Sequence, residues 1–132
     1  MAQIKVRIYY EDTDAGGIVY HTNHLKYMER GRSELLRDYG FEQDELMLQG
    51  VSFVASELTI KYHHPARFNE ILTVTTEIES LRRVGFSFDQ KIHNQNGCLI
   101  ASAHVMIAAI DPTTMKPKAI PNSIKEVFQR AL

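Results

Sequence analysis

Apolar side chains alternate with polar ones along most of this 132-residue chain. That period of two is the pattern of strands with one buried face, so it restricts the fold to one built mainly on a sheet. In the first such segment Ile4, Val6 and Ile8 share one face, which we expect to continue to Tyr10. The predicted strands are residues 4–10, 52–62, 72–78, 84–92 and about 98–110.

Irregularities in the alternation predict where these strands bend and turn. Phe53 is out of phase with the even positions that follow it, which predicts a bulge near Ala55. Between the last two segments, Asn96-Gly97 predicts a hairpin with a type I′ turn, which needs positive φ at both residues. Pro112 is expected to end the last strand, because proline has no N–H to give to the ladder.

One segment alone has the period of a long helix, with apolar residues every three or four positions. They are Leu25, Met28, Leu35 and Tyr39. Thr22 or Asn23 can cap the start of this helix, and Gly40 suits its end. Gly31 lies on the apolar stripe, where glycine costs about 1 kcal/mol of helix propensity. We therefore expect the helix to approach a sheet closely at Gly31.

A second, short helix is expected at the C-terminus, capped by Asn122 or Ser123. Its predicted inner stripe is Ile124, Val127, Phe128 and Leu132. The order strand, helix, then four strands as antiparallel hairpins predicts an α+β fold. We expect a five-stranded antiparallel sheet with the long helix on one face, in a single domain of residues 1–132.

The charges are balanced, with 15 Lys and Arg against 16 Asp and Glu and a formal net charge of -1. Nucleic acid and anionic membranes need a basic surface, so neither is expected as the main partner. Cys98 is the single cysteine, which excludes an internal disulfide and fits a reducing compartment. The N-terminus has no leader pattern, and no apolar run approaches a membrane span. We expect a cytoplasmic protein without an integral membrane segment.

The stretch richest in chemistry is residues 9–32, YYEDTDAGGIVYHTNHLKYMERGR. Asp14 stands beside a glycine turn at Gly17, where a ligand can approach the backbone, and Tyr20-His21 directly precedes the helix. N–H groups left unpaired at a helix start can stabilise a developing oxyanion. A carboxylate, a phenol, an imidazole and such N–H groups together suit acyl transfer. An aspartate before glycines is also a common turn, so the residues alone leave a purely structural role open.

The motif YYEDTDAGGIVYH, followed by ERGRSE, closely resembles the signature of YbgC-type acyl-CoA thioesterases. These belong to the 4-hydroxybenzoyl-CoA thioesterase family of the hotdog superfamily, and AIDPTTMKPKAIP resembles the segment before the family's last helix. The resemblance implies the hotdog fold and hydrolysis of an acyl-CoA, with no cofactor. It implies that Asp14 is the catalytic carboxylate and that Tyr10 and His21 belong to the same site. Family members usually have Tyr or Phe at the position of His24, and often Ala at that of Gly31.

Two mechanisms are open for Asp14: attack on the carbonyl to form an anhydride that water cleaves, or activation of water. Backbone N–H groups near Tyr20 and His21 would hold the thioester oxygen, and Gly17 would let the substrate approach. The alternative function is a non-catalytic protein that binds acyl-CoA or acyl carrier protein, or an interaction subunit near an envelope system. A hotdog dehydratase is a third option. A simple binder needs no carboxylate near the electrophilic carbon, so Asp14 favours the enzyme.

The phosphates of CoA would be met by cations. Arg82 and Arg83, at the expected turn from the third strand to the fourth, are candidates, together with Lys116 and Lys118 in the late loop. Exposed Lys and Arg are common on any surface, so this assignment is an expectation only. Acyl carrier protein is a second acyl donor to consider.

Two glutamates on the long helix offer another catalyst, because a different hotdog branch uses a helix glutamate. We expect Glu29 and Glu34 to be solvated or paired with Arg30 or Arg37.

Histidines raise the question of a metal. Neither His63-His64 nor the pair His21 and His24 has further ligands at convincing spacing, so no metal site is expected. His104 is interpreted as a residue on a sheet face.

One helix covers only part of a five-stranded sheet, so a monomer would leave apolar sheet surface exposed. We expect a homodimer or homotetramer in which the strand from about Phe53 to Tyr62 pairs with its symmetry mate and removes an open edge. Val54, Ser56 and Tyr62 would then face the neighbouring subunit's site.

Overall fold

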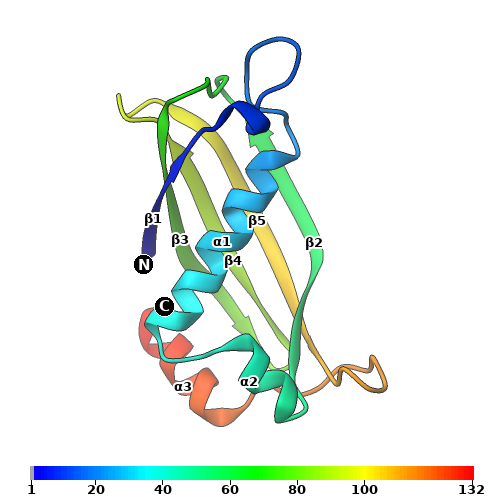
Figure 1. Cartoon of the computed structure of the whole chain (residues 1–132). Coiled ribbons are helices and arrows are strands. Elements are labelled where there is room, and N and C mark those ends of the chain that lie inside the picture. The colour runs from blue at the N-terminus through cyan, green and yellow to red at the C-terminus, as the bar shows by residue number, and fades with distance from the viewer. Residues whose placement is uncertain (1) are drawn as a thin grey trace.

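The computed structural model describes residues 2–132 and consists of one sheet and three α-helices (Figure 1). A one-turn 3-10 helix, η1, lies between the first strand and the first α-helix. The elements in chain order are β1 (Ala2–Arg7), η1 (Tyr10–Asp12), α1 (Asn23–Asp38), α2 (Gln43–Leu48), β2 (Ser52–Tyr62), β3 (Ile71–Arg82), β4 (Gly85–His93), β5 (Leu99–Ile110) and α3 (Asn122–Ala131).

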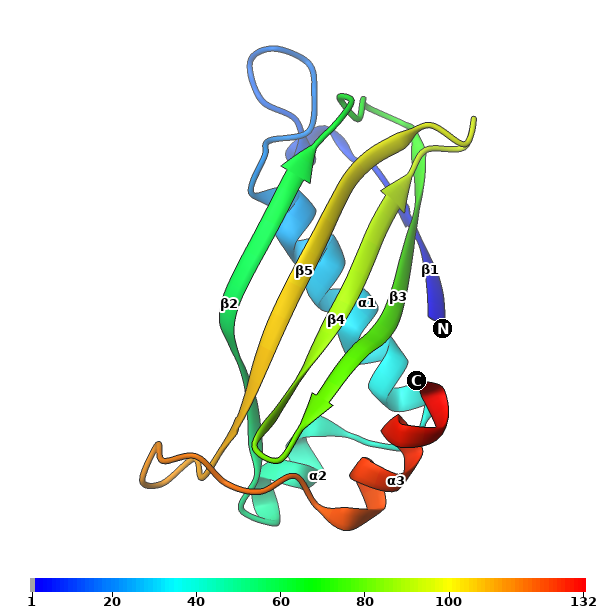
Figure 2. The same cartoon turned by 180° about the vertical axis from the view of Figure 1, so that it is seen from behind.

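The sheet has the order β1-β3-β4-β5-β2, and every neighbouring pair is antiparallel (Figure 2). The predicted α+β class and five-stranded antiparallel sheet are confirmed. One expectation is wrong: β2 forms no hairpin with β3 but pairs along its length with β5. Residues 63–70 carry the chain past the end of the sheet, and the N–H of His63 donates to the carbonyl of Ile100 at 2.8 Å. The two edges of the sheet are therefore β1 and β2.

The first strand is shorter than its alternation predicts. Ile8 is fully buried, but Tyr10 is 80% exposed and belongs to η1. The chain leaves the sheet because the backbone N–H of Tyr9 donates to Asp12 Oδ2 at 2.8 Å, which closes a turn in place of a ladder bond. The bulge expected near Ala55 is confirmed, since the register of β2 against β5 shifts between Ala55 and Glu57.

The turn between β4 and β5 lies where Asn96-Gly97 predicts it, but its type differs. Gly97 has φ +81°, whereas Asn96 is not among the residues with positive φ. The N–H of Gly97 donates to the carbonyl of Asn94, and Asn94 Oδ1 accepts the N–H groups of Asn96 and Cys98. The side chain of Asn94 thus favours a three-residue loop with a left-handed glycine at its end over a type I′ turn.

The turn between β3 and β4 is confirmed with a shift of one residue. Arg82 is the last residue of β3 and pairs with Gly85, so Arg83 and Val84 form the turn. Val84, expected to open the fourth strand, is instead 37% exposed at the tip of the hairpin. β5 ends at Ile110, as the following Asp-Pro pair predicts.

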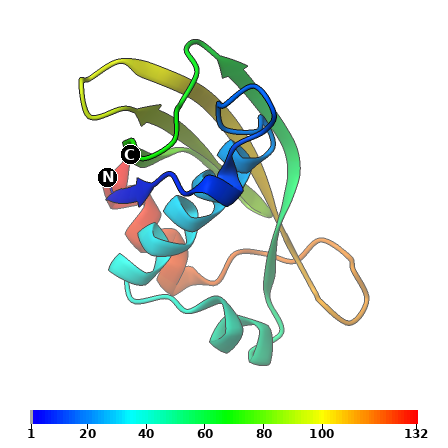
Figure 3. The ribbon, with the colours of Figure 1, turned by 45° about the horizontal axis from the view of Figure 1, so that its top comes forward.

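The helix α1 lies within the curve of the sheet, and α2 and α3 lie together toward one end (Figure 3). The expected close approach at Gly31 is confirmed. A Cβ at this position would lie 2.8 Å from Thr76 Oγ1, 3.0 Å from Val74 Cγ1 and 3.2 Å from Gln90 Nε2. An alanine Cβ would therefore press on these three side chains, which would have to shift to admit it.

Gln90 forms the polar contact between the helix and the sheet. Its side chain is fully buried, and its Nε2 donates to the carbonyl of Met28 at 2.8 Å and to Thr76 Oγ1 at 2.9 Å. Its Oε1 accepts a hydrogen bond from Arg32 Nη1 at 3.0 Å. Because the amide uses both its donors and its acceptor, its burial carries no unpaired polar group.

The predicted capping of α1 is confirmed at its C-terminal end but not at its N-terminal end. Neither Thr22 nor Asn23 caps the start through its side chain, because the amide of Asn23 donates to Asp12 Oδ1 at 3.1 Å instead. Gly40, with φ +87°, ends the helix as expected.

The two shorter helices differ most from what the sequence predicts. α2 was not predicted, because six residues are too few to establish a helical period. In α3, Ile124 and Phe128 are buried as expected, but the N-cap is Pro121 and neither predicted cap residue serves. Leu132 follows the helix end and is 60% exposed, so it is not part of the inner stripe. Within residues 2–132 no helix combines the length and the apolar character needed to cross a membrane.

We predict that Gly31→Ala destabilises the protein. The gain in helix propensity is about 1 kcal/mol, whereas overpacking costs about 1–3 kcal/mol, so the net loss is expected to be on the order of 1 kcal/mol. Urea unfolding of Gly31→Ala, Thr76→Ala and the double variant measures it. Removal of Thr76 Oγ1 should make the Gly31 substitution less costly, and strictly additive losses would contradict the contact.

Candidate functional site

The motif region forms a small hairpin beyond the end of the sheet, before the first turn of α1. Thr13 pairs with Val19, and the N–H of Asp14 donates to the carbonyl of Ile18 at 2.9 Å. The N–H of Gly17 returns to the carbonyl of Asp14 at 3.0 Å, and Gly17 has φ +78°. Glycine is therefore required at 17 by the left-handed backbone of the turn.

Asp14 uses only half of its carboxylate in this turn. Oδ1 accepts the N–H of Gly16 at 2.8 Å, while Oδ2 accepts no hydrogen bond from any of residues 2–132. The side chain is exposed to solvent. A free, exposed carboxylate oxygen on a glycine turn is available to a ligand as a base or a nucleophile.

The turn at Asn94 supplies an internal comparison. It has the same pattern, with a left-handed glycine three residues on and the side-chain oxygen accepting the N–H two residues on. In that turn the side-chain amide oxygen of Asn94 accepts the hydrogen bond that corresponds to the one accepted by the Asp14 carboxylate in the hairpin. The negative charge of Asp14 is therefore not needed to build its turn.

Asp14 lines a cavity of about 470 Å³ with Tyr10, Gly17 and Phe68, together with Thr13 and Ala15. Tyr10 packs edge-on against Phe68, with ring centroids 5.9 Å apart. Within the described residues Tyr10 donates no hydrogen bond to the Asp14 carboxylate, because η1 turns the phenol outward to 80% exposure. Phe68 was not predicted, since it follows β2 and no motif marks it.

A second cavity, of about 420 Å³, lies at the start of α1. Its walls are mostly apolar and are Ile18, Val19, His21, His24, Tyr62, His63, His64 and Pro65. The carbonyl of His21 accepts two hydrogen bonds here, from Tyr62 Oη at 2.7 Å and from His24 Nδ1 at 3.0 Å. Tyr62, expected to face a neighbouring subunit's site, thus binds the motif of its own chain.

The amides before α1 are the other half of the candidate site. The carbonyl of His21 is held by Tyr62 and His24, which fixes the peptide plane that also carries the N–H of Thr22. Within residues 2–132 the N–H groups of His21 and Thr22 donate to no protein acceptor. They are the kind of donors that a helix start offers to an anion. Tyr20 is 47% exposed, and its ring centroid lies 4.6 Å from that of His21.

Asp12 holds this region together. Its Oδ2 accepts the N–H of Tyr9, and its Oδ1 accepts the amide of Asn23 on α1. Burial, reinforced by the nearby Asp12 carboxylate, raises the pKa of Tyr27. Of the two aspartates in the motif, Asp12 is therefore structural and Asp14 keeps a free oxygen.

The predicted site residues are only partly brought together. Tyr10, Asp14 and Gly17 share one cavity, and His21 lines the neighbouring one. Arg82 and Arg83 lie on the β3–β4 turn, at the opposite end of the sheet from the motif hairpin (Figure 1). The sequence could not indicate this separation, because it does not reveal which end of the sheet a turn occupies.

The two glutamates of α1 line neither of the cavities beside the motif hairpin. Glu34 pairs with Arg37 as expected. Glu29 is exposed to solvent, the other outcome expected; it accepts the hydroxyl of Ser33 at 2.9 Å, while Arg30 lies over the ring of Tyr27. A cavity of about 260 Å³ beside Glu29 extends along the helix toward β2.

The family model described as the thioesterase-like superfamily matches residues 8–128. The chain belongs to the thioesterase-like superfamily. Acyl-CoA thioester hydrolase YbgC of Escherichia coli O157:H7 is 44% identical over 125 residues, which cover 95% of this chain and 93% of that protein. Acyl-CoA thioesterase YbgC of Haemophilus influenzae is 40% identical over 124 residues, covering 93% and 90%.

The solved structures agree with this family. The crystal structure of a probable thioesterase from Bartonella henselae has a TM-score of 0.84 at 35% identity, and the match covers 91% of this chain and 98% of that one. The hotdog fold expected for this superfamily member, a five-stranded antiparallel sheet around one long helix, is confirmed.

We predict that His24 makes stability depend on pH. Its ring is 3% exposed, and burial lowers its pKa from the ordinary 6.5. The unfolded chain therefore binds more protons than the folded protein, and the free energy of unfolding should fall as pH drops through about 6.5. In His24→Phe, urea unfolding between pH 7.5 and 5 should show a weaker loss than in the parent protein. His63→Gln, which removes an exposed imidazole, is the control, and an unchanged slope in His24→Phe would contradict the prediction.

Proposed function

We propose that this protein is an acyl-CoA thioester hydrolase with Asp14 as its catalytic carboxylate. The observation that carries the proposal is the unpaired Oδ2 of Asp14, which stands on a glycine turn close in sequence to the free N–H groups before α1. The names of the YbgC relatives, which match over nearly the whole chain, support an acyl-CoA substrate.

In the first step the thioester carbonyl oxygen accepts hydrogen bonds from the backbone N–H groups of His21 and Thr22. Negative charge develops on that oxygen as the carbonyl carbon becomes tetrahedral, and the positive end of the α1 dipole stabilises it. Tyr62 and His24 act as positioning residues, because their hydrogen bonds to the His21 carbonyl fix the direction of the adjoining N–H.

Asp14 then acts in one of two ways. As a nucleophile, Oδ2 attacks the carbonyl carbon, the C–S bond breaks, CoA leaves as a thiolate, and water cleaves the resulting anhydride. As a general base, Oδ2 takes a proton from water, whose oxygen attacks the same carbon while CoA leaves. Both routes give the free acid and CoA and regenerate the carboxylate. Label in Asp14 after a single turnover in ¹⁸O-water would establish the nucleophilic route with water attacking the Asp14 carbonyl of the anhydride. General-base catalysis places the label in the free acid alone, as does attack of water on the acyl carbon of the anhydride.

We further propose that the substrate passes Gly17 and Tyr20 and that the apolar cavity between His24 and Tyr62 receives part of it. Tyr10 would contact the substrate rather than the carboxylate, since its phenol is exposed beside Phe68. Acyl carrier protein is a second acyl donor to be tested with CoA esters.

Within one chain Arg82 and Arg83 lie far from the motif hairpin, but a homodimer formed through β2 would place them at the same end as the partner's motif hairpin. β2 is an edge strand of 11 residues whose outer side is open to pairing. Antiparallel pairing of two copies about a two-fold axis would bring the β3–β4 turn of one chain to the same end as the motif hairpin of the other. We propose that Arg82 and Arg83 reach the phosphates of CoA across this dimer, and that two dimers can form a tetramer. We also propose that the protein acts in the cytoplasm, where its free Cys98 stays reduced.

Asp14→Asn should lower kcat by about 10²–10⁴ for acyl-CoA hydrolysis, because the amide can neither attack nor accept the proton. The variant should fold normally, since Asn94 builds an equivalent turn with an amide. Thiol release from a panel of acyl-CoA esters measures the effect. Asp38→Asn, an exposed acid at the far end of α1, is the matched control, and His21→Ala should cost less because it keeps the backbone N–H. Near-normal turnover in a folded Asp14→Asn protein would exclude this role.

Light scattering on a sizing column should give two or four times the chain mass of 15.1 kDa. Dilution that dissociates the dimer should reduce activity in parallel, because the proposed CoA site is shared. A monomer at micromolar concentration with full thioesterase activity would rule out the shared site.

A further inference from the structure

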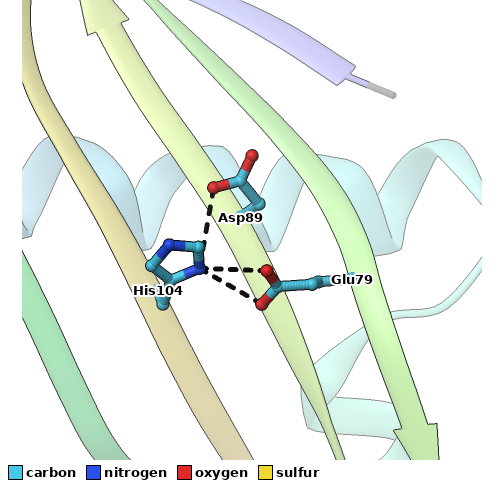
Figure 4. A group of neighbouring side chains, drawn as sticks. All are labelled: Glu79, Asp89 and His104. Carbon is cyan, nitrogen blue, oxygen red and sulfur yellow. Dashed lines mark hydrogen bonds and ion pairs between the residues drawn. The ribbon is translucent and has the colours of Figure 1, made fainter.

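Three potential metal ligands meet on the face of the sheet opposite α1 (Figure 4). They are Glu79 on β3, Asp89 on β4 and His104 on β5, and one ligand atom from each lies within 4.8 Å of the others. His104 Nδ1 is 3.1 Å from Glu79 Oε1 and 3.7 Å from Asp89 Oδ1. Within residues 2–132 this is the one group of three such residues that meets these distances.

Strand register explains why these residues meet. Asp89 stands directly opposite His104 in the β4–β5 ladder. On β3 the register shifts between Ile78 and Ser80, so Glu79 is the extra residue of a bulge. A bulge re-aims a side chain relative to the regular alternation, and here it places the carboxylate of Glu79 over the Asp89 and His104 pair. Three adjacent strands thus hold the ligands on a rigid support.

An ordinary ion pair leaves part of this arrangement unexplained. Nδ1 carries at most one hydrogen, yet both oxygens of Glu79 and one of Asp89 lie 3.1–3.7 Å from it. The carboxylate of Asp89 accepts no hydrogen bond from residues 2–132. Glu77, opposite Asp89, adds another negative charge on this face, and Lys91 is the nearest lysine along β4.

We propose that Glu79, Asp89 and His104 bind a divalent transition-metal ion. Zn²⁺ at about 2.0–2.2 Å from nitrogen and oxygen ligands separates them by about 3.4 Å in a tetrahedral site, which lies between the two measured separations. Imidazole with carboxylates suits Zn²⁺ and its neighbours better than Mg²⁺ or Ca²⁺. The ion neutralises the two carboxylates, and water completes its coordination.

The surroundings support a ligand role for Glu79. The hydroxyl of Ser87, which is 6% exposed, lies 3.4 Å from Glu79 Oε2 and 2.5 Å from the hydroxyl of Ser80. A hydrogen-bonding partner behind a ligating carboxylate orients it toward the metal. The site is independent of the proposed thioesterase chemistry, because it lies on the other face of the sheet from α1.

Isothermal titration of the full chain with Zn²⁺ tests this site. One saturable Zn²⁺ per chain is expected, with binding weakened about tenfold or more in His104→Gln and Glu79→Gln. Glu77→Gln is the matched control, since it removes the same charge from the same strand and face, and its affinity should change less than about threefold. Glu77, Glu79 and His104 are all exposed, so the three variants should fold.

A melting-temperature series gives a second measure. Zn²⁺ should raise the melting temperature of the parent protein and of Glu77→Gln but not of His104→Gln, because a ligand that binds only the folded state stabilises it. Absence of saturable binding would overturn the proposal. So would equal weakening in Glu77→Gln, which indicates attraction by charge alone, or binding that survives loss of His104, which indicates another histidine.

Discussion

The close contact of α1 with the sheet at Gly31 sets how near the helix backbone lies to β3 and β4. Without a side chain at that position, the helix backbone meets Thr76 and Val74 on β3 and Gln90 on β4 directly. The separation of helix and sheet then sets the depth of the core in which Met28, Leu35 and Phe88 are buried. It also determines that the start of α1 emerges beside the end of β2. A larger residue there would press on Thr76 Oγ1 and Val74 Cγ1, so these side chains or the helix would have to shift.

Two aspartates have different roles in the motif hairpin: one joins the hairpin to α1, and the other keeps a free oxygen. Asp12 joins the backbone at Tyr9 to Asn23 on the helix and has both its oxygens engaged. Asp14 contributes one oxygen to its own turn and keeps the other free. A site of this kind uses both, because the segment that carries a reactive carboxylate has to be held in position by other contacts.

Local patterns in the sequence were sufficient for most of the fold. Alternation located the strands, and Gly31 on an apolar stripe indicated the close helix–sheet contact. The pairing of β2 with β5 could not be read in this way, because alternation tells which face of a strand is buried but not which strand lies beside it. For the same reason the sequence could not indicate that Tyr62 binds the His21 carbonyl of its own chain, or that Arg82 and Arg83 lie at the other end of the sheet from Asp14.

The functional residues likewise fall into those that local sequence order reveals and those that only strand pairing brings together. The motif identifies Asp14, Gly17 and His21 by their order in the chain, since all three lie within one hairpin and the turn that follows it. Glu79, Asp89 and His104 have no common spacing, and they meet only through strand register and one extra residue in β3. His104 therefore appeared from the sequence as an isolated residue on a sheet face.

The buried amide of Gln90 has a mechanical consequence for the helix it touches. It binds the carbonyl of Met28 and the guanidinium of Arg32, which lie one turn apart on the same side of α1. Hydrogen bonds from one buried strand residue to two positions of the helix restrict rotation of the helix about its axis, in addition to the close apolar packing. The N–H groups before α1 lie about 9 Å from this anchor, at 1.5 Å per residue. The hydrogen bonds of Gln90 thus support, from nearly two turns away, the orientation that Tyr62 and His24 fix locally.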